Sequence, residues 1–201
     1  MPRTPRPGQW RSDQLSQSFI ADYKPFVMVD GEGVRCSLYV SGCPFACEGC
    51  FNQAAWSFRY GTPWDEELQE RILGDLAHEA VQGLTLLGGE PFLNTGVCLE
   101  LVHAVRERFG HTKDVWSWTG YTFEELQGET ADKQELLAQL DVLVDGRFEL
   151  SQRDLTLQFR GSRNQRVLDA PASLSAGHAV QWGRLRDAER TYEQVQRRPL
   201  L

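Results

Sequence analysis

The chain has 201 residues, a hydrophobic fraction of 41% and a net charge of −7. A chain of this length forms one domain by default and can bury a substantial core. The acidic balance argues against general binding to nucleic acid or to an anionic membrane surface. No run of about 18 apolar residues occurs, so we expect no membrane span.

The cysteines indicate a reducing compartment. Their number is five, which is odd, and three of them are clustered. Small secreted domains instead pair their cysteines in disulfides. Residues 1–17 contain no apolar segment of the kind found in secretory signals. We therefore expect a cytoplasmic protein.

The first 17 residues predict a mobile, basic leader, because they hold three of the nine prolines and three arginines. After the leader, Cys36–Ser41 predicts a strand. Thr62–Asp65 predicts a helix start, with Thr62 as the cap and Pro63 in the first helical position. Apolar residues at helical spacing follow up to Ala80.

The rest of the chain repeats this alternation of strand and helix signals. Strands are expected at residues 84–87, 114–118 and 142–144, and helices at about 97–105 and 133–140. Strands separated by helices of this length predict βαβ units around a mostly parallel sheet. The pattern is weaker after residue 150, where we expect an edge strand at 155–159 and a polar terminal helix at 184–196.

Ligands of parallel sheets gather at the carboxyl ends of the strands. Four predicted strand ends carry polar or reactive residues: the cysteine loop, Gly88-Gly89-Glu90-Pro91, Trp118-Thr119-Gly120 and Asp145-Gly146. The sequence therefore predicts one functional site along this edge of the sheet.

The cysteine loop carries three thiols with gaps of three and two residues, at Cys43, Cys47 and Cys50. A structural zinc site closes with four protein ligands, and no fourth Cys or His follows nearby. Thiolates also suit iron–sulfur clusters, and three ligands on a four-iron cube would leave one iron free. From ligand softness alone, a cluster and a zinc or redox module remain open. Cys36 and Cys98 are expected to be buried, small hydrophobic residues.

The Gly88-Gly89-Glu90 loop adds a second signal. Two residues without a Cβ let a backbone come close to a ligand, and a carboxylate can accept a hydrogen bond from an ammonium group. The loop follows a predicted strand about forty residues after the cysteines. A tight turn alone is the other interpretation.

The cysteine spacing resembles that of the radical S-adenosylmethionine (radical SAM) superfamily. In that superfamily, three cysteines hold a [4Fe–4S] cluster and S-adenosylmethionine chelates the remaining iron. The resemblance implies that the iron ligands are Cys43, Cys47 and Cys50. A Gly-Gly-Glu-Pro motif in the superfamily holds the methionine amino group, which implies a cofactor-binding role for Gly88, Gly89 and Glu90.

Further motifs are similar to glycyl-radical activating enzymes, and in particular to anaerobic ribonucleoside-triphosphate reductase activating proteins. These motifs are Asp30–Arg35, Glu48–Asn52 with Trp56, Trp118–Leu126, Asp141–Phe148 and Phe159–Arg166. The similarity covers about residues 19–182. Gly49 stands where many superfamily members carry an aromatic residue that touches adenine, and the resemblance then implies that Phe51 supplies the aromatic surface. Trp118 and Thr119 complete the candidate cofactor-binding residues.

The resemblance implies a fold, a reaction and partners. The fold is α/β, an incomplete (β/α) barrel of mostly parallel strands, with a leader at 1–17, a radical SAM domain at 18–183 and a tail at 184–201. A low-potential electron cleaves S-adenosylmethionine, and the resulting 5′-deoxyadenosyl radical removes a hydrogen from a glycine of the large reductase subunit. The electron donor would be a flavodoxin or ferredoxin. No protein residue is assigned as a catalytic acid or base.

Two alternatives stand beside this reading. The chain could activate another glycyl-radical enzyme, or act as a small radical SAM enzyme on a small molecule. It could also belong to a different class, as a zinc-binding or redox module without catalysis.

Overall fold

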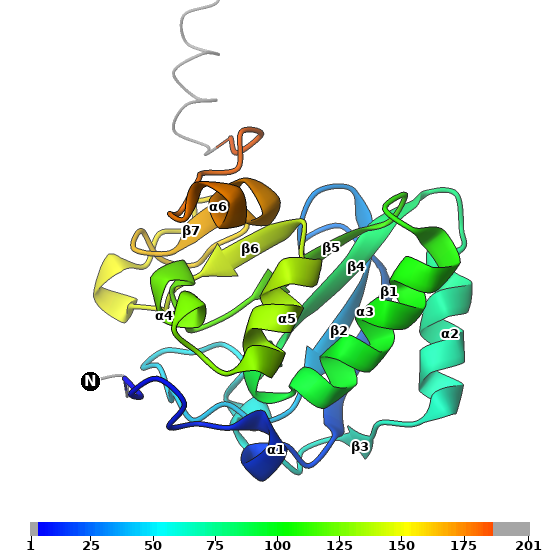
Figure 1. The fold of residues 1–201 in the computed structure, drawn as a ribbon, viewed down its shortest axis with the longest axis horizontal. Coiled ribbons are helices and arrows are strands. Elements are labelled where there is room, and N and C mark those ends of the chain that lie inside the picture. Colours follow the sequence, from blue (N-terminus) through cyan, green and yellow to red (C-terminus); the bar gives the residue numbers. More distant parts are fainter. Residues whose placement is uncertain (1–3, 187–201) are drawn as a thin grey trace, which may run out of the picture.

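A computed structural model describes residues 4–186 of the chain (Figure 1). The strands are β1 (Phe19–Val27), β2 (Val34–Val40), β3 (Thr62–Pro63), β4 (Val81–Gly88), β5 (Asp114–Trp118), β6 (Val142–Asp145) and β7 (Arg166–Asp169). The α-helices are α1 (Ser12–Leu15), α2 (Glu66–Leu76), α3 (Thr95–Phe109), α4 (Phe123–Gln127), α5 (Ala131–Gln139) and α6 (Ala170–Ala176). Short 3-10 helices are η1 (Gln53–Trp56), η2 (Pro91–Leu93) and η3 (Leu150–Gln152).

Within residues 4–186, the strands form one open, seven-stranded sheet with the order β3-β1-β2-β4-β5-β6-β7. The pairs β2–β4, β4–β5 and β5–β6 are parallel, whereas β1, β3 and β7 pair antiparallel toward the two edges. The α/β prediction with a parallel centre is confirmed. Because the carboxyl ends of β2, β4, β5 and β6 lie at one edge, the four loops singled out in the sequence emerge there together.

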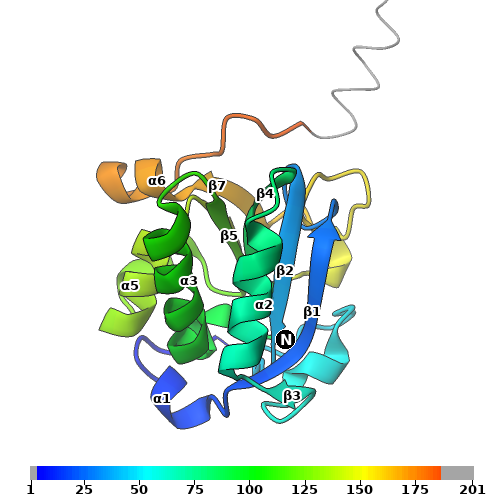
Figure 2. The same ribbon diagram turned by 90° about the vertical axis from the view of Figure 1, so that its right-hand side faces the viewer.

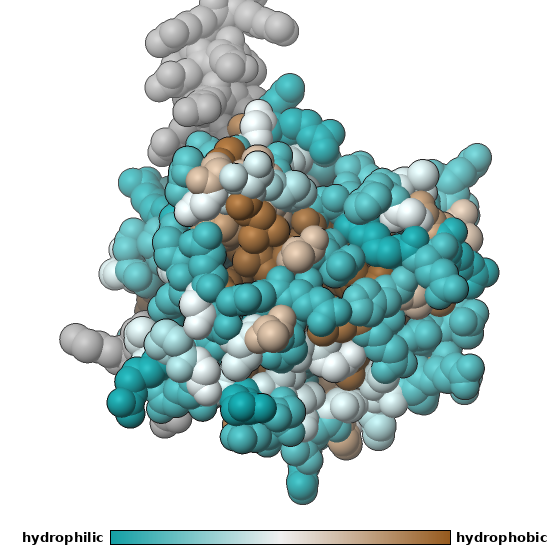
Figure 3. Space-filling model, in the orientation of Figure 1, coloured by the Kyte–Doolittle hydropathy of each residue, from teal (hydrophilic) through white to brown (hydrophobic). Residues whose placement is uncertain are grey.

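Helices cover one face of the sheet. Figures 1 and 2 show α2, α3 and α5 side by side on this face, while the loops that follow β2 and β6 lie toward the other face. Fully buried strand residues such as Leu38, Leu84 and Leu86 join Leu101 and Val105 of α3 in the core. The outer surface of this helical layer is mostly hydrophilic (Figure 3). The helices therefore pack on one face of the sheet, and the loops after β2 and β6 are free to form a site toward the other face.

Helix α2 begins later than the sequence predicts. Thr62 and Pro63 form the short strand β3, which pairs with Phe19 and Ile20 of β1. Proline is tolerated in an edge strand because it needs no partner for an N–H. Asp65 is the N-cap instead, and its carboxylate accepts a hydrogen bond from the backbone N–H of Leu68 at 2.9 Å.

The sequence analysis also misses one strand and predicts another that does not form. The sequence analysis does not identify β1, whose residues are mostly half-exposed, so the strand lacks a continuous apolar pattern. Residues 155–159 form turns and bends rather than an edge strand, and Leu155 is 80% exposed. The predicted terminal helix at 184–196 lies almost entirely outside the described residues. Among residues 4–186, no helix is long and apolar enough to cross a membrane.

The arginine at the start of β2 is a buried support of the sheet. Arg35 is fully buried, and its Nη2 lies 2.6 Å from Asp114 Oδ1 at the start of β5. Its guanidinium also donates to Thr85 Oγ1 at 2.7 Å and to the Leu84 carbonyl at 2.8 Å. The group lies 5.1 Å from the centre of the Trp116 ring. Arg35 therefore links β2, β4 and β5 at the edge opposite the cysteine loop.

We predict that Arg35→Ala lowers the free energy of unfolding by about 3–5 kcal/mol, because it removes a fully buried guanidinium and leaves the partly buried Asp114 carboxylate without its ion-pair partner. Urea denaturation of the metal-free protein measures this change. Arg108→Ala is the matched control, since the Arg108–Glu70 pair lies at the surface and contributes about 0–1 kcal/mol. Equal losses in the two variants would contradict the supporting role of Arg35.

Candidate cluster-binding site

The site is built on a backbone junction between two strand ends. The N–H of Gly89 donates to the Val40 carbonyl at 2.7 Å, and the N–H of Glu90 donates to the Gly42 carbonyl at 2.9 Å. A Cβ on Gly89 would lie 2.6 Å from the Gly42 oxygen. The loop after β4 thus packs directly on the first residues of the cysteine loop, and only glycine fits at this contact.

Gly42 is restricted in the same way. Its φ is +101°, and a Cβ there would lie 1.9 Å from the ring of Phe58. Its N–H donates to the Ala55 carbonyl at 2.8 Å, and the N–H of Cys43 donates to the Trp56 carbonyl at 3.1 Å. The cysteine loop is therefore closed at its base by its own returning segment.

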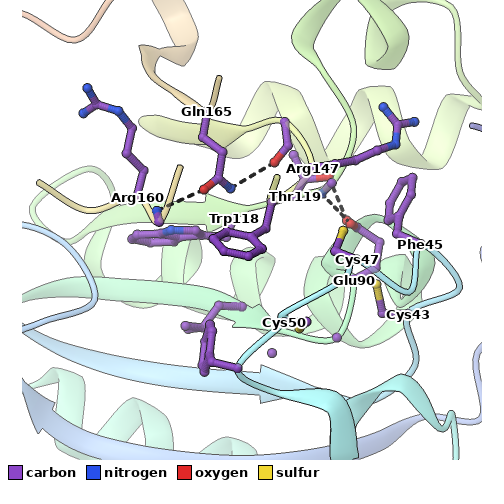
Figure 4. A pocket seen from close by; sticks show the side chains of 18 of the residues that line it. Cys43, Phe45, Cys47, Cys50, Glu90, Trp118, Thr119, Arg147, Arg160 and Gln165 are labelled. Atoms are coloured by element: carbon purple, nitrogen blue, oxygen red, sulfur yellow. Dashed lines mark hydrogen bonds between the residues drawn. The ribbon is translucent and has the colours of Figure 1, made fainter. Parts of the chain in front are cut away.

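The three cysteines of the loop line one cavity of about 390 Å³ (Figure 4). All three thiols are free, with Cys47 buried and the other two half-buried. Left-handed backbone at Ala46 (φ +50°) and Gly49 (φ +76°) bends the chain between them. Cys43, Cys47 and Cys50 therefore share one cavity, and their role as iron ligands stays a prediction.

Burial affects the acidity of two of the thiols, those of Cys43 and Cys47. It raises the pKa of Cys43, and the charge of Glu90 adds to this effect. It also raises the pKa of Cys47, opposed by the Phe148 backbone N–H and the charge of Arg147. A buried thiolate is unfavourable unless a positive charge lies beside it. A coordinating metal supplies that charge and deprotonates the thiol.

The donor set is chemically suited to an iron–sulfur cluster, because it consists of three free thiols, which are soft ligands. Within residues 4–186, no three His, Cys, Asp or Glu side chains lie close enough to hold one metal ion. A tetrahedral zinc ion would need its sulfur ligands about 3.8 Å apart, given Zn–S bonds of about 2.3 Å. In a four-iron cube each thiolate binds a different iron, and three thiols line the cavity here.

Glu90 lies in the wall of the cavity with only 1% of its surface exposed. One carboxylate oxygen accepts from Thr119 Oγ1 at 2.8 Å and from the Phe92 N–H at 3.1 Å. The other accepts from the Gly120 N–H at 2.8 Å. Burial raises the pKa of Glu90 to about 7, although these hydrogen bonds oppose the rise. The carboxylate thus ties the end of β4 to the end of β5.

The other predicted residues divide into wall and rim. Trp118 lines the cavity and donates from Nε1 to the Phe159 carbonyl at 2.9 Å, while Thr119 is buried and holds Glu90. Gly88 and Gly89 also line the cavity, and Phe51 lies at its mouth with 88% of its surface exposed. Gly49 does not itself line the cavity, and a Cβ there would lie 2.9 Å from Leu150 and 3.3 Å from Phe148.

Arg147 is a lining residue that the sequence analysis did not assign. It follows β6, and its guanidinium lies 4.7 Å from the centre of the Phe45 ring. It forms a two-point ion pair with Glu125, at 3.0 and 3.2 Å. Its position directly after the Asp145-Gly146 strand end is the feature of the sequence from which a place in the site could have been predicted. Asp145 itself is fully buried and accepts from the Phe123 N–H at 2.8 Å, so it supports the loops rather than facing the cavity.

Comparison with known proteins agrees with this geometry. The 4Fe–4S single cluster domain family matches residues 29–168. The anaerobic ribonucleoside-triphosphate reductase-activating protein of Pasteurella multocida is 47% identical over 147 residues, which cover 71% of this chain and 92% of that protein. The chain belongs to this activating-protein family. Relatives with the same description from Vibrio cholerae and Escherichia coli K12 are 43% and 38% identical, over 92% and 94% of their lengths.

The raised pKa of the buried Glu90 carboxylate predicts how the stability of the protein depends on pH. The folded-state pKa of Glu90 is raised from 4.5 to about 7. Its stabilising contribution is therefore complete below about pH 4.5 and is lost as the pH rises through about 7. Between about pH 5 and 8, we predict that the metal-free wild type loses roughly 3 kcal/mol relative to Glu90→Gln. Urea denaturation at a series of pH values measures this, and parallel curves for the two proteins would contradict it.

Proposed function

We propose that this chain is a radical SAM activating enzyme that generates a glycyl radical on the large subunit of anaerobic ribonucleoside-triphosphate reductase. The observation that carries the proposal is a single cavity lined by three free thiols and by the glycine-rich loop after β4. Family membership supports the same function. The open sheet would then correspond to an incomplete barrel of the radical SAM type.

In this proposal a [4Fe–4S] cluster is held by Cys43, Cys47 and Cys50. When bound, the cluster supplies the electron that cleaves the S–C5′ bond of S-adenosylmethionine. The chain provides the ligands, shapes the cavity and excludes water. Gly88 and Gly89 offer backbone groups to the methionine part, and Trp118 and Phe51 offer aromatic surface. Glu90 and Thr119 hold these walls in place.

The mouth of the cavity supports docking of a protein partner. Val29 and Phe51 line the cavity and are 75% and 88% exposed, and Met28 beside Val29 is 73% exposed. Exposed apolar residues grouped around a cavity mark binding surfaces. A reductase segment that covers them would bring its glycine to the cavity and keep water out. The electron donor, a flavodoxin or ferredoxin, and a cytoplasmic location belong to the same proposal.

Anaerobic reconstitution tests the function. We expect about four irons per chain, cleavage of S-adenosylmethionine under a strong reductant, and a glycyl-radical EPR signal when the reductase subunit is added. Stoichiometric zinc without cleavage would instead support the non-catalytic module. Cleavage without a glycyl signal on the reductase would indicate a different radical acceptor.

We further predict that Cys47→Ser abolishes cluster binding, because it removes one of three thiolate ligands. Iron content and visible absorbance after reconstitution measure this. Cys98→Ala is the matched control, since Cys98 is buried within α3 and lies apart from the cavity lining. A full iron load in Cys47→Ser would contradict the ligand assignment.

A further inference from the structure

We propose that residues 8–12 form a strap that positions the cysteine loop, with Trp10 acting on the loop through Phe45. The strap lies outside residues 29–168, the segment matched by the cluster-domain family. The inference rests on the proposed function only in that the positioned loop is the cluster-binding loop. Figure 1 shows the N-terminal segment, in blue, running along the end of the sheet from which that loop emerges.

Phe45 is the buried anchor of the cysteine loop, and it lies between the first two cysteines. It is 1% exposed, and Figure 4 shows it beside Cys43 and Glu90. Its ring meets the Trp10 ring edge-on at 5.1 Å and the Tyr121 ring at 5.0 Å. Such edge-to-face pairs contribute beyond the area they bury. Because a cysteine lies two residues away on each side, the position of this ring sets the position of both thiols.

Trp10 is itself fixed by a buried ion pair. Its carbonyl accepts a hydrogen bond from Lys133 Nζ at 2.7 Å. Lys133 is fully buried, pairs with Glu129 at 2.8 Å and donates to Tyr121 Oη at 3.2 Å. The N–H of Gly8 donates to the same Glu129 carboxylate at 3.1 Å. Buried charges need their full set of partners, and the strap supplies one to each member of this pair.

The other end of the strap is fixed to the start of α3. The hydroxyl of Ser12 is buried and accepts from the Thr95 N–H at 2.9 Å, which satisfies a donor that the helix leaves unpaired. Ser16, just beyond the strap, donates to Asn94 Oδ1 at 2.8 Å. Asn94 in turn donates to the Ser41 carbonyl at 2.9 Å, directly before the cysteine loop.

These contacts make a continuous path of packed groups from the strap to the cluster ligands. Lys133 and Glu129 hold the backbone around Trp10, the Trp10 ring packs on Phe45, and Phe45 lies between two cysteines. Burial of Phe45 between two aromatic rings leaves the loop little freedom to open. The strap should therefore slow both the motion of the loop and the access of oxygen to a bound cluster.

The test compares Trp10→Ala with the wild-type chain by two measurements. In the metal-free protein, amide hydrogen exchange of residues 43–50 should become faster by up to about tenfold, as expected for loss of one aromatic pair. In the reconstituted protein, the cluster absorbance should bleach faster in air by a similar factor. Trp10→Phe keeps an edge-to-face ring and should restore both rates to within about twofold.

Arg11→Ala is the matched control. The Arg11 side chain is next to Trp10 in sequence but is half exposed, and among the described ion pairs it pairs only with Asp13. The substitution should leave both rates unchanged. In a Phe45→Leu background, Trp10→Ala should add little, because residues that act through one another are not additive. A full additional effect in that background would show that Trp10 does not act through Phe45.

Unchanged exchange and bleaching in Trp10→Ala would overturn the proposal. If no protein, wild type included, takes up iron, the proposed function fails. Exchange of residues 43–50 in the metal-free chain would still decide whether the strap holds the loop. The two proposals can therefore fail separately.

Discussion

The buried carboxylate of Glu90 is the interaction on which the site depends most. Its three hydrogen bonds join the end of β4 to the end of β5 and to the start of η2. Its own N–H reaches the Gly42 carbonyl at the base of the cysteine loop. One residue therefore sets the spacing of three loops around the cavity. Such an acceptor must stay buried and fully paired, because an unpaired buried carboxylate is strongly unfavourable.

This role changes the meaning of the glycine-rich motif. The resemblance implies contact with a cofactor amino group, whereas the structure shows Glu90 engaged by protein donors and nearly free of exposed surface. The two glycines before it permit backbone contact with the cysteine loop. The motif thus has a structural role in building the site, and its contact with a cofactor stays a prediction.

The fold is most predictable from the sequence where strands are buried on both faces of the sheet. β2, β4 and β6 are almost fully buried and appear as apolar runs, so their positions are confirmed. β1 is exposed along much of its length, so its pattern gives no signal. The cysteines are predictable because their chemistry is local. Arg147 and Phe45 are not, because their importance comes from contacts between distant segments.

The N-terminal segment shows the same limit from the opposite direction. Its prolines and arginines predict a mobile leader, yet in the structure residues 8–12 supply a carbonyl, an N–H and an aromatic ring to buried groups. Composition reports the average tendency of a segment to bury itself, whereas docking depends on a few residues. Here the groups that need partners, Lys133 and Glu129, lie more than 115 residues later in the chain. A buried ion pair that the core cannot satisfy alone therefore explains why a polar leader is held in place.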